Sequence, residues 1–283
     1  MYIEFFGLAE KPFNITADPN YLFESSIHEP ALDSLLYGIE SKAGIMVLTG
    51  PVGTGKTTLC RSILEKLSNT TNTCFLMNPI FDPIDVLKAI NQDFGLANQG
   101  SLKELMDVLN QFLLESMEAG LNNLIIVDEA QNLSIESLET LRLLSNLETT
   151  KHKVLQILLV GQPELVEKLA SPRLLQLNQR VVIRVSLSAL TESDSNHYIL
   201  HRLAKANGLG KVLFDEKTLK SIFKYSHGFP RMINLLCDRI LLALYAKGLR
   251  QVNKKIVKAA YQELKANNIQ RPFWKRRLSS VYH

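Results

Sequence analysis

Cysteine is scarce in this 283-residue sequence, and the few cysteines do not form a recognisable site. Cys60, Cys74 and Cys237 have no CxxC spacing and no histidine partners at the intervals of a metal site. This pattern argues against a disulfide framework and a cysteine-based metal site, and it predicts reduced, buried thiols in a cytosolic protein.

A long hydrophobic run is also lacking, and so is the sequence pattern of a signal peptide. No stretch approaches the roughly 18 apolar residues of a membrane helix, since the nearest candidate, MINLLCDRILLALYA, carries Asp238 and Arg239 in its middle. The N-terminus, MYIEFFGLAEKPF, has neither a basic segment nor a long apolar segment, so we expect that it does not act as a signal peptide. With 46% hydrophobic and 21% charged residues, the composition is typical of a globular protein with one large domain and a smaller one.

An excess of positive charge is lacking everywhere except at the C-terminal end. The net charge is +4, but from Asn253 onward eight Lys or Arg residues stand against one acid, Glu263. That end of the chain therefore carries +7, which leaves −3 for the rest. An argument for nucleic-acid binding by the whole protein fails, because only the C-terminus is basic.

Short apolar runs alternate with segments of helical spacing over the first two thirds of the chain. The runs predict five strands, at 44–50, 73–78, 124–128, 154–161 and 181–185. Near-continuous apolar strands separated by helices indicate a parallel sheet covered on both faces. After Leu187 the strands stop, and four helical segments follow, at 191–208, 215–228, 230–248 and 252–268.

This pattern predicts an α/β fold with a three-layer αβα core, a five-stranded parallel sheet and a small all-helical domain after it. We expect four parts along the chain: a cap packed on the core over 1–43, the core over 44–189, a helical lid over 190–267 and a basic tail over 268–283.

The strongest motif is GPVGTGKT, from Gly50 to Thr57, which fits G-x-x-x-x-G-K-[ST] in full between a predicted strand and a predicted helix. The glycines let the backbone turn its N–H groups toward phosphate at a helix N-terminus. Lys56 would reach the β- and γ-phosphates, and the Thr57 hydroxyl would bind Mg²⁺. We therefore expect ATP and Mg²⁺ as ligands. The predicted nucleotide-binding residues of this loop are Gly50, Pro51, Val52, Gly53, Thr54, Gly55, Lys56, Thr57 and Thr58.

A second motif, NNLIIVDEAQNLS, is an apolar strand that ends in two acids. Beside a P-loop, Asp128 would hold Mg²⁺ and Glu129 would act as general base on the attacking water. Gln131 and Asn132 are expected only to begin the turn into the next helix. A helicase would need a second parallel-sheet core, whereas the chain after Leu187 is helical. A P-loop core followed by a helical lid is instead the arrangement of AAA+ ATPases.

That arrangement predicts three further catalytic residues. Gln162, at the end of the fourth strand, would contact the γ-phosphate or water. Arg180, just before the fifth strand, would complete the site of a neighbouring subunit, with Arg173 as the alternative. Arg231 would reach the phosphates from the start of the third lid helix, whose first turn is fixed by Pro230.

Several stretches together resemble one family. LTGPVGTGKTTLCR, LLSNLET, LQILLVGQPEL and HGFPRMINLLCDRILLALYA, with FFGL and KPF near the start, are similar to the AAA+ domain of the general secretion pathway protein A (ExeA-type) family and its relatives in pilus and exopolysaccharide clusters. The resemblance covers about residues 1–265. It implies a cytoplasmic, oligomerising ATPase that works with a membrane partner in assembling a secretion machine at the inner membrane.

Many members continue into a membrane helix and a peptidoglycan-binding domain, whereas this sequence stops at RPFWKRRLSSVYH. Its basic tail is typical of the cytoplasmic flank of a membrane span or of contact with the membrane surface, and equally of a solvated end. The protein would be tethered to the inner membrane if the native chain continues past His283.

Two other hypotheses stay open at this stage. One is a DNA-handling AAA+ ATPase similar to transposition accessory proteins, which would bind phosphate backbones through its basic tail. The other is a nucleotide-dependent scaffold with little turnover. Residues near Tyr21–Phe23 and the helix start in SIHEPAL are expected to contact adenine. Arg142 with Glu148 is expected to face a neighbouring subunit.

Overall fold

The computed structural model describes residues 1–67, 69–77, 82–146 and 153–266. The predicted basic tail and Glu148 lie outside the described residues. The described chain forms two compact units: Ala17–Ser188 is one, and Met1–Thr16 together with the chain from Ala189 onward is the other.

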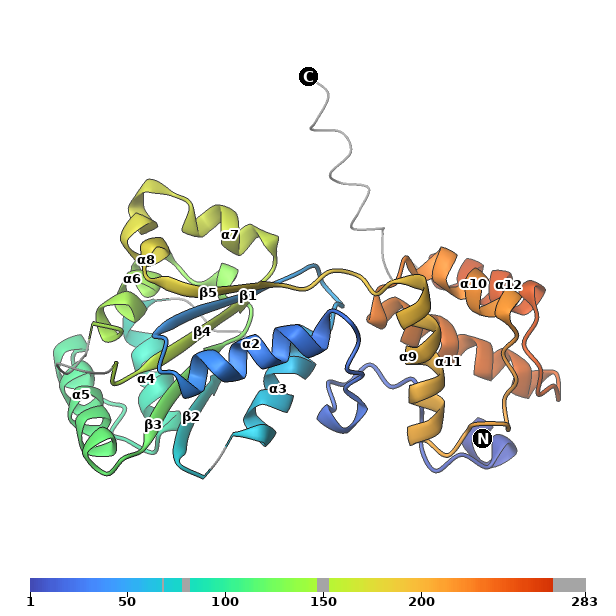
Figure 1. The fold of residues 1–283 in the computed structure, drawn as a ribbon, viewed down its shortest axis with the longest axis horizontal. Coiled ribbons are helices and arrows are strands. Elements are labelled where there is room, and N and C mark those ends of the chain that lie inside the picture. The colour runs from blue at the N-terminus through green and yellow to red at the C-terminus, as the bar shows by residue number, and fades with distance from the viewer. Residues whose placement is uncertain (68, 78–81, 147–152, 267–283) are drawn as a thin grey trace, which may run out of the picture. The chain divides into compact units, whose positions relative to one another are not determined.

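A five-stranded parallel sheet forms the centre of the first unit, in the order β2-β3-β4-β1-β5 (Figure 1). Its strands are β1 (Ile45–Thr49), β2 (Thr71–Leu76), β3 (Asn122–Val127), β4 (Gln156–Gly161) and β5 (Val181–Ser186). Each lies within about two residues of the predicted run. The register pairs Thr49 of β1 with Gly161 of β4, so the segments that follow β1, β3 and β4 leave the sheet at the same edge.

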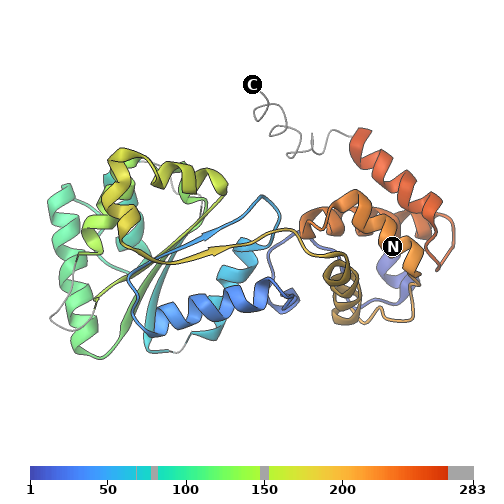
Figure 2. The same ribbon diagram turned by 45° about the horizontal axis from the view of Figure 1, so that its top comes forward.

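Helices cover both faces of this sheet, as Figure 1 and Figure 2 show. Alternate strand residues such as Met46 and Ile126 pack against α2 (His28–Glu40) and α3 (Lys56–Lys66) on one face. Their neighbours Val47 and Ile125 face the opposite layer. That layer contains α4 (Pro83–Asp93), α5 (Leu102–Glu118), α6 (Ile135–Leu144), α7 (Pro163–Leu169) and α8 (Leu175–Gln179). The predicted α/β fold with its three-layer αβα core is therefore confirmed, although the short helices α7 and α8 were not predicted.

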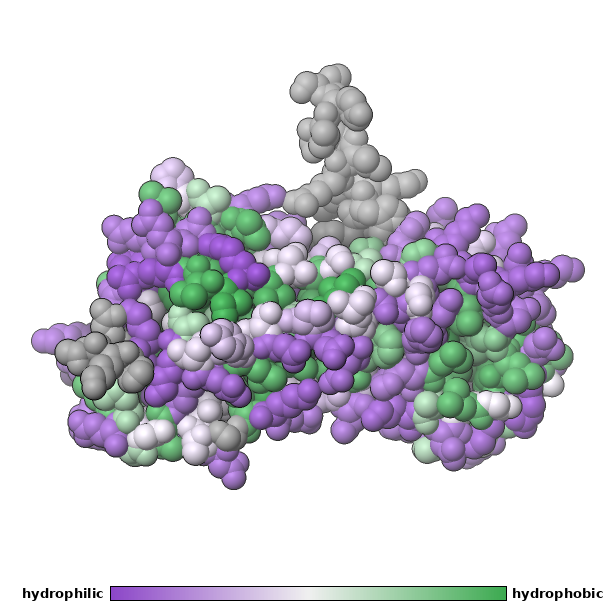
Figure 3. All heavy atoms as spheres, in the orientation of Figure 1, coloured by the Kyte–Doolittle hydropathy of each residue, from purple (hydrophilic) through white to green (hydrophobic). Residues whose placement is uncertain are grey.

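Local sequence signals explain where several of these helices begin. Ser101 and Glu104 form a capping box at the start of α5, in which each side chain satisfies a backbone N–H of the other residue. Ser134 caps α6, and Pro163 occupies the first turn of α7, where a missing N–H has no cost. On the face drawn in Figure 3, hydrophobic residues are scattered among hydrophilic ones.

The second unit consists of α9 (Glu192–Lys205), α10 (Glu216–Ser226), α11 (Pro230–Ala246), α12 (Lys254–Ala266) and the N-terminal segment with α1 (Tyr2–Phe6). The Tyr2 hydroxyl donates to Asp238 at 2.7 Å, and the buried Arg202 donates to the carbonyl oxygens of Pro12 and Asn14. The first 16 residues thus pack with the lid helices, whereas the sequence predicted that all of 1–43 caps the core. None of the described helices is long and apolar enough to cross a membrane.

Candidate nucleotide-binding site

The P-loop connects the end of β1 to the start of α3. Gly53 and Gly55 have φ angles of 82° and 98°, in the left-handed region that glycine adopts without steric cost. A Cβ on Gly50 would lie 2.6 Å from the Leu187 carbonyl oxygen, so this position also requires glycine. The Thr54 hydroxyl donates to the Pro51 carbonyl at 2.9 Å. The loop is therefore folded tightly over the N-terminus of an 11-residue helix, where backbone N–H groups favour anions.

A buried histidine supports this loop from the side. His28 Nε2 lies 2.8 Å from the Thr54 carbonyl oxygen, and its Nδ1 lies 2.7 Å from the Ser25 hydroxyl. Neutral imidazole can donate through Nε2 and accept through Nδ1, so one tautomer satisfies both contacts. The sequence suggested that this helix start lies near the adenine, but it gave no signal for a contact between His28 and the P-loop.

Lys56 is held at the loop by main-chain oxygens. Its ammonium donates to the carbonyls of Gly50 at 2.8 Å and Pro51 at 3.1 Å, and the residue is buried. Burial lowers the pKa of Lys56, while the nearby carboxylates of Glu129 and Asp128 raise it. This buried positive charge suits a triphosphate, because Lys56 would exchange its weak carbonyl partners for anionic phosphate oxygens.

Asp128 and Thr57 meet directly. The Thr57 hydroxyl donates to Asp128 Oδ2 at 2.7 Å, and Asp128 Oδ1 accepts the backbone N–H of Glu129 at 2.9 Å. Burial raises the pKa of Asp128 despite these two hydrogen bonds, which lower it. A hydroxyl and a carboxylate are hard oxygen ligands of the kind that Mg²⁺ prefers. The described residues contain no cluster of three or more metal-ligating side chains, so this donor set fits an ion shared with phosphate and water.

Glu129 has a left-handed backbone, with φ 56° and ψ 36°. Its carboxylate oxygen Oε2 accepts the Gln131 amide at 2.5 Å and the Gln162 amide at 3.0 Å. The structure therefore brings together two residues that were predicted separately as catalytic, Glu129 and Gln162, while the predicted contact of Gln162 with the γ-phosphate or water stays a prediction. It also places Gln131 between them, against the expectation that Gln131 only begins a turn.

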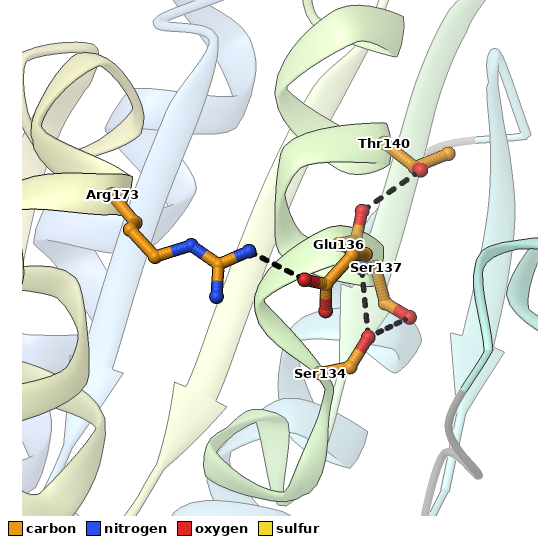
Figure 4. A network of polar contacts seen from close by, with 5 residues as sticks. All are labelled: Ser134, Glu136, Ser137, Thr140 and Arg173. Carbon is orange, nitrogen blue, oxygen red and sulfur yellow. Dashed lines mark hydrogen bonds and ion pairs between the residues drawn. The ribbon is translucent and has the colours of Figure 1, made fainter.

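The two candidate trans arginines differ in their surroundings. Arg173 donates to Glu136 of α6 at 2.6 Å, beside the hydrogen bonds of Ser134, Ser137 and Thr140 (Figure 4). Arg180 is exposed immediately before β5, and its side chain has no hydrogen-bond or ion-pair partner among the residues that the structure describes. Its role toward a neighbouring subunit stays a prediction.

The remaining predicted residues divide between the two units. Val52 and Thr58 lie in the loop and the first turn of α3 with the rest of the motif. Pro230 is the buried first residue of α11 and Arg231 is exposed beside it. Both belong to the helical unit, and their contact with nucleotide stays a prediction. Arg142 is paired with Glu139 of its own helix at 2.7 Å, and nothing tests the neighbour contact predicted for it.

Comparison with known families gives a match for the part of the chain that carries this site. The AAA domain family matches residues 39–169, which span the P-loop, the acidic strand and β4. This part of the chain is therefore similar to an AAA domain, and it has a P-loop αβα fold.

One curated relative is the General secretion pathway protein A of Aeromonas hydrophila, which is 43% identical over 265 residues. The match covers 93% of this chain and 48% of the relative, so the chain spans about half of that protein's length. The resemblance predicted from the sequence is confirmed.

Solved structures show the same fold at low sequence identity. The ORC2 protein of Aeropyrum pernix is 18% identical with a TM-score of 0.68, over 92% of this chain and 73% of that one. Cdc6p from Pyrobaculum aerophilum is 20% identical with a TM-score of 0.72, over 90% and 71%. At this identity the likeness concerns the fold alone.

Proposed function

We propose that this chain binds and hydrolyses ATP as an AAA+ ATPase. The observation that carries the proposal is the contact between the Thr57 hydroxyl and the Asp128 carboxylate, with Glu129 next to it and Lys56 on the same loop. A protein that only binds nucleotide has no need of a positioned base beside the metal ligands.

In this mechanism the P-loop amides and Lys56 would bind the phosphates, while Thr57 and Asp128 would hold Mg²⁺. The ion would neutralise charge on the β- and γ-phosphates. Glu129 accepts a proton from water as the water oxygen bonds to the γ-phosphorus. The bond between the γ-phosphorus and the oxygen that bridges to the β-phosphate breaks, and ADP and inorganic phosphate leave. Gln162 orients Glu129 through its 3.0 Å contact.

The proposal extends to assembly and partners. Arg180 would enter the site of a neighbouring copy in a homo-oligomer, and Arg231 beside Pro230 would contact the phosphates from the helical lid. Movement at the hinge near Ser188–Thr191 would pass to a membrane or secretion-system partner at the cytoplasmic face of the inner membrane. The name of the Aeromonas relative, General secretion pathway protein A, supports this setting. No contact of the described residues favours nucleic acid as the partner.

The test is the Glu129→Gln variant, which keeps size and removes the base. ATP binding should stay within about threefold, whereas turnover should fall about 10²- to 10⁴-fold. Glu65→Gln is the matched control, because Glu65 is exposed on α3 and loses the same charge. Unchanged turnover in Glu129→Gln would instead support a scaffold whose residual hydrolysis is incidental.

The assembly part needs a separate test. Arg180→Ala should keep ATP binding and lose about 10³-fold in turnover if its guanidinium acts in trans. Arg184→Ala is the control, because Arg184 is an exposed arginine on β5 that donates to Asn178. Arg173→Ala is measured beside it, because a loss of turnover in Arg173→Ala alone would assign the trans role to Arg173. Mixing Arg180→Ala with Glu129→Gln protein should restore part of the activity. Turnover unaltered in Arg180→Ala would rule out this role.

A further inference from the structure

The side chain of Gln131 lies inside the reaction site rather than on the turn that follows it. Its amide nitrogen donates to Glu129 Oε2 at 2.5 Å, and its amide oxygen accepts the backbone N–H of Gln162 at 3.1 Å. We propose that Gln131 is a positioning residue that fixes the Glu129 carboxylate for catalysis. This inference rests on the proposed function, because it deepens the role given there to Glu129.

The four hydrogen-bonding groups form a closed ring. The Glu129 carboxylate contacts the Gln131 amide, which contacts the main chain of Gln162, whose side chain returns to Glu129 at 3.0 Å. Both neighbours dictate the same orientation of the Gln131 amide. If the amide were flipped, its oxygen would face a carboxylate and its NH₂ would face an N–H, so both contacts would become repulsive.

The backbone around Gln131 is shaped for this placement. A Cβ on Gly161 would lie 2.7 Å from the Gln131 amide oxygen, so the glycine at the end of β4 leaves the room that the amide occupies. The Lys168 ammonium of α7 donates to the Gln131 carbonyl at 3.0 Å. Side chain and main chain of Gln131 are therefore each held by a separate element.

The ring also explains how Glu129 keeps its unusual backbone. A left-handed backbone is strained for a non-glycine residue and persists only when its surroundings determine it. Asp128 fixes the N–H of Glu129, and the two glutamines fix its carboxylate. Both amides reach Oε2, and among the described residues none donates to Oε1. Oε1 is thus the oxygen left to accept a proton from water.

The experiment is a double-mutant cycle between positions 131 and 129. Gln131→Met keeps the length of the side chain and removes the amide. We expect kcat to fall about 10-fold, as for the loss of one hydrogen bond to a charged group, with the dissociation constant for ATP within about twofold. In the Glu129→Gln background, Gln131→Met should cause no further loss, because the two residues act as a unit.

Two more variants make the test decisive. Asn132→Ala is the control, since Asn132 is the exposed neighbour on the same turn, and its kcat should not change. Gln131→Glu is isosteric and sets a carboxylate against Glu129, so kcat should fall at least as far as in Gln131→Met. This variant keeps the proposal testable if Gln131→Met folds poorly.

The outcomes separate the two claims. If Glu129→Gln lowers kcat but Gln131→Met and Gln131→Glu do not, the positioning role is wrong and the proposed function stands. The role is equally wrong if Gln131→Met lowers kcat by the same factor in both backgrounds, or weakens ATP binding instead. If Glu129→Gln itself turns over normally, the proposed function fails and this inference fails with it.

Discussion

The two sides of the candidate site are built from different kinds of contact. On the P-loop side, His28, Thr54 and Lys56 all bond to main-chain carbonyls. On the acidic side, side chains donate to the reacting groups: Thr57 donates to Asp128 Oδ2, and two glutamine amides donate to Glu129 Oε2. Main-chain contacts fix the shape of a cradle, whereas side-chain contacts fix the orientation of reacting groups. The P-loop side should therefore govern binding, and the acidic side should govern turnover.

The largest expected effect on the binding side is that of Lys56→Ala. It removes the buried charge that would face the phosphates, and losing one partner of such a charged contact costs about 2 to 5 kcal/mol. ATP affinity should fall about 10²-fold or more, as measured by equilibrium titration. Arg61→Ala is the control, because it removes a cation from the same helix. Arg61 donates to the Ala17 carbonyl, so its loss should leave ATP affinity within about threefold. Wild-type ATP affinity in Lys56→Ala would contradict the claim that the P-loop side governs binding.

A somewhat smaller effect is expected for Gln162→Met on the acidic side. It removes the amide that reaches Glu129 at 3.0 Å but keeps the backbone N–H that Gln131 uses. Turnover should fall about 10- to 30-fold at saturating ATP, with little change in KM. A rise in KM without a fall in kcat would place Gln162 on the binding side instead.

His28→Ala should produce the reverse pattern at about 10-fold. The substitution leaves the Thr54 carbonyl without its 2.8 Å partner and opens space beside Gly55, whose Cβ position lies 3.1 Å from Nε2. KM for ATP should rise while kcat at saturation changes less than about threefold. His28→Asn, which retains a donor, should recover part of the loss.

The smallest effect is on stability and comes from Asp128→Asn. Burial raises the pKa of Asp128 above its ordinary value of 3.8, so the folded state disfavours the ionised form. Without Mg²⁺, the variant should be more stable than wild type near pH 7 by about 0.5 to 2 kcal/mol. At low pH the Asp128 carboxyl of the wild type is protonated, so it is neutral like the amide of the variant. The stability advantage of the variant should therefore shrink as the pH falls toward 3.8. Denaturant unfolding across the acid range measures it.

Sequence patterns predicted the features that follow from periodicity and spacing. The five strands follow from apolar runs, and the P-loop from glycines and a lysine at fixed intervals. Asp128 and Glu129 follow from an apolar strand that ends in acids. These signals are local, because each element is determined by residues within a few positions of one another.

The unpredicted features depend on contacts between distant parts of the chain. Arg202 bonds to the Pro12 carbonyl. Every residue has a main-chain carbonyl, so the sequence around Pro12 does not indicate that this one accepts a hydrogen bond. Gln131 reaches Gln162 only because β3 and β4 are adjacent and Gly161 leaves space. A close reading could have noted that Gln131 and Gln162 follow neighbouring strands, but not that their amides meet at Glu129.

The most direct test of this account measures ATP affinity and kcat side by side in Lys56→Ala and Glu129→Gln. Lys56→Ala should lose affinity about 10²-fold or more, whereas Glu129→Gln should bind ATP like wild type and lose about 10²-fold or more in kcat. Equal losses of affinity in both variants, or wild-type kcat in Glu129→Gln, would contradict the division of the site into a binding side and a reacting side.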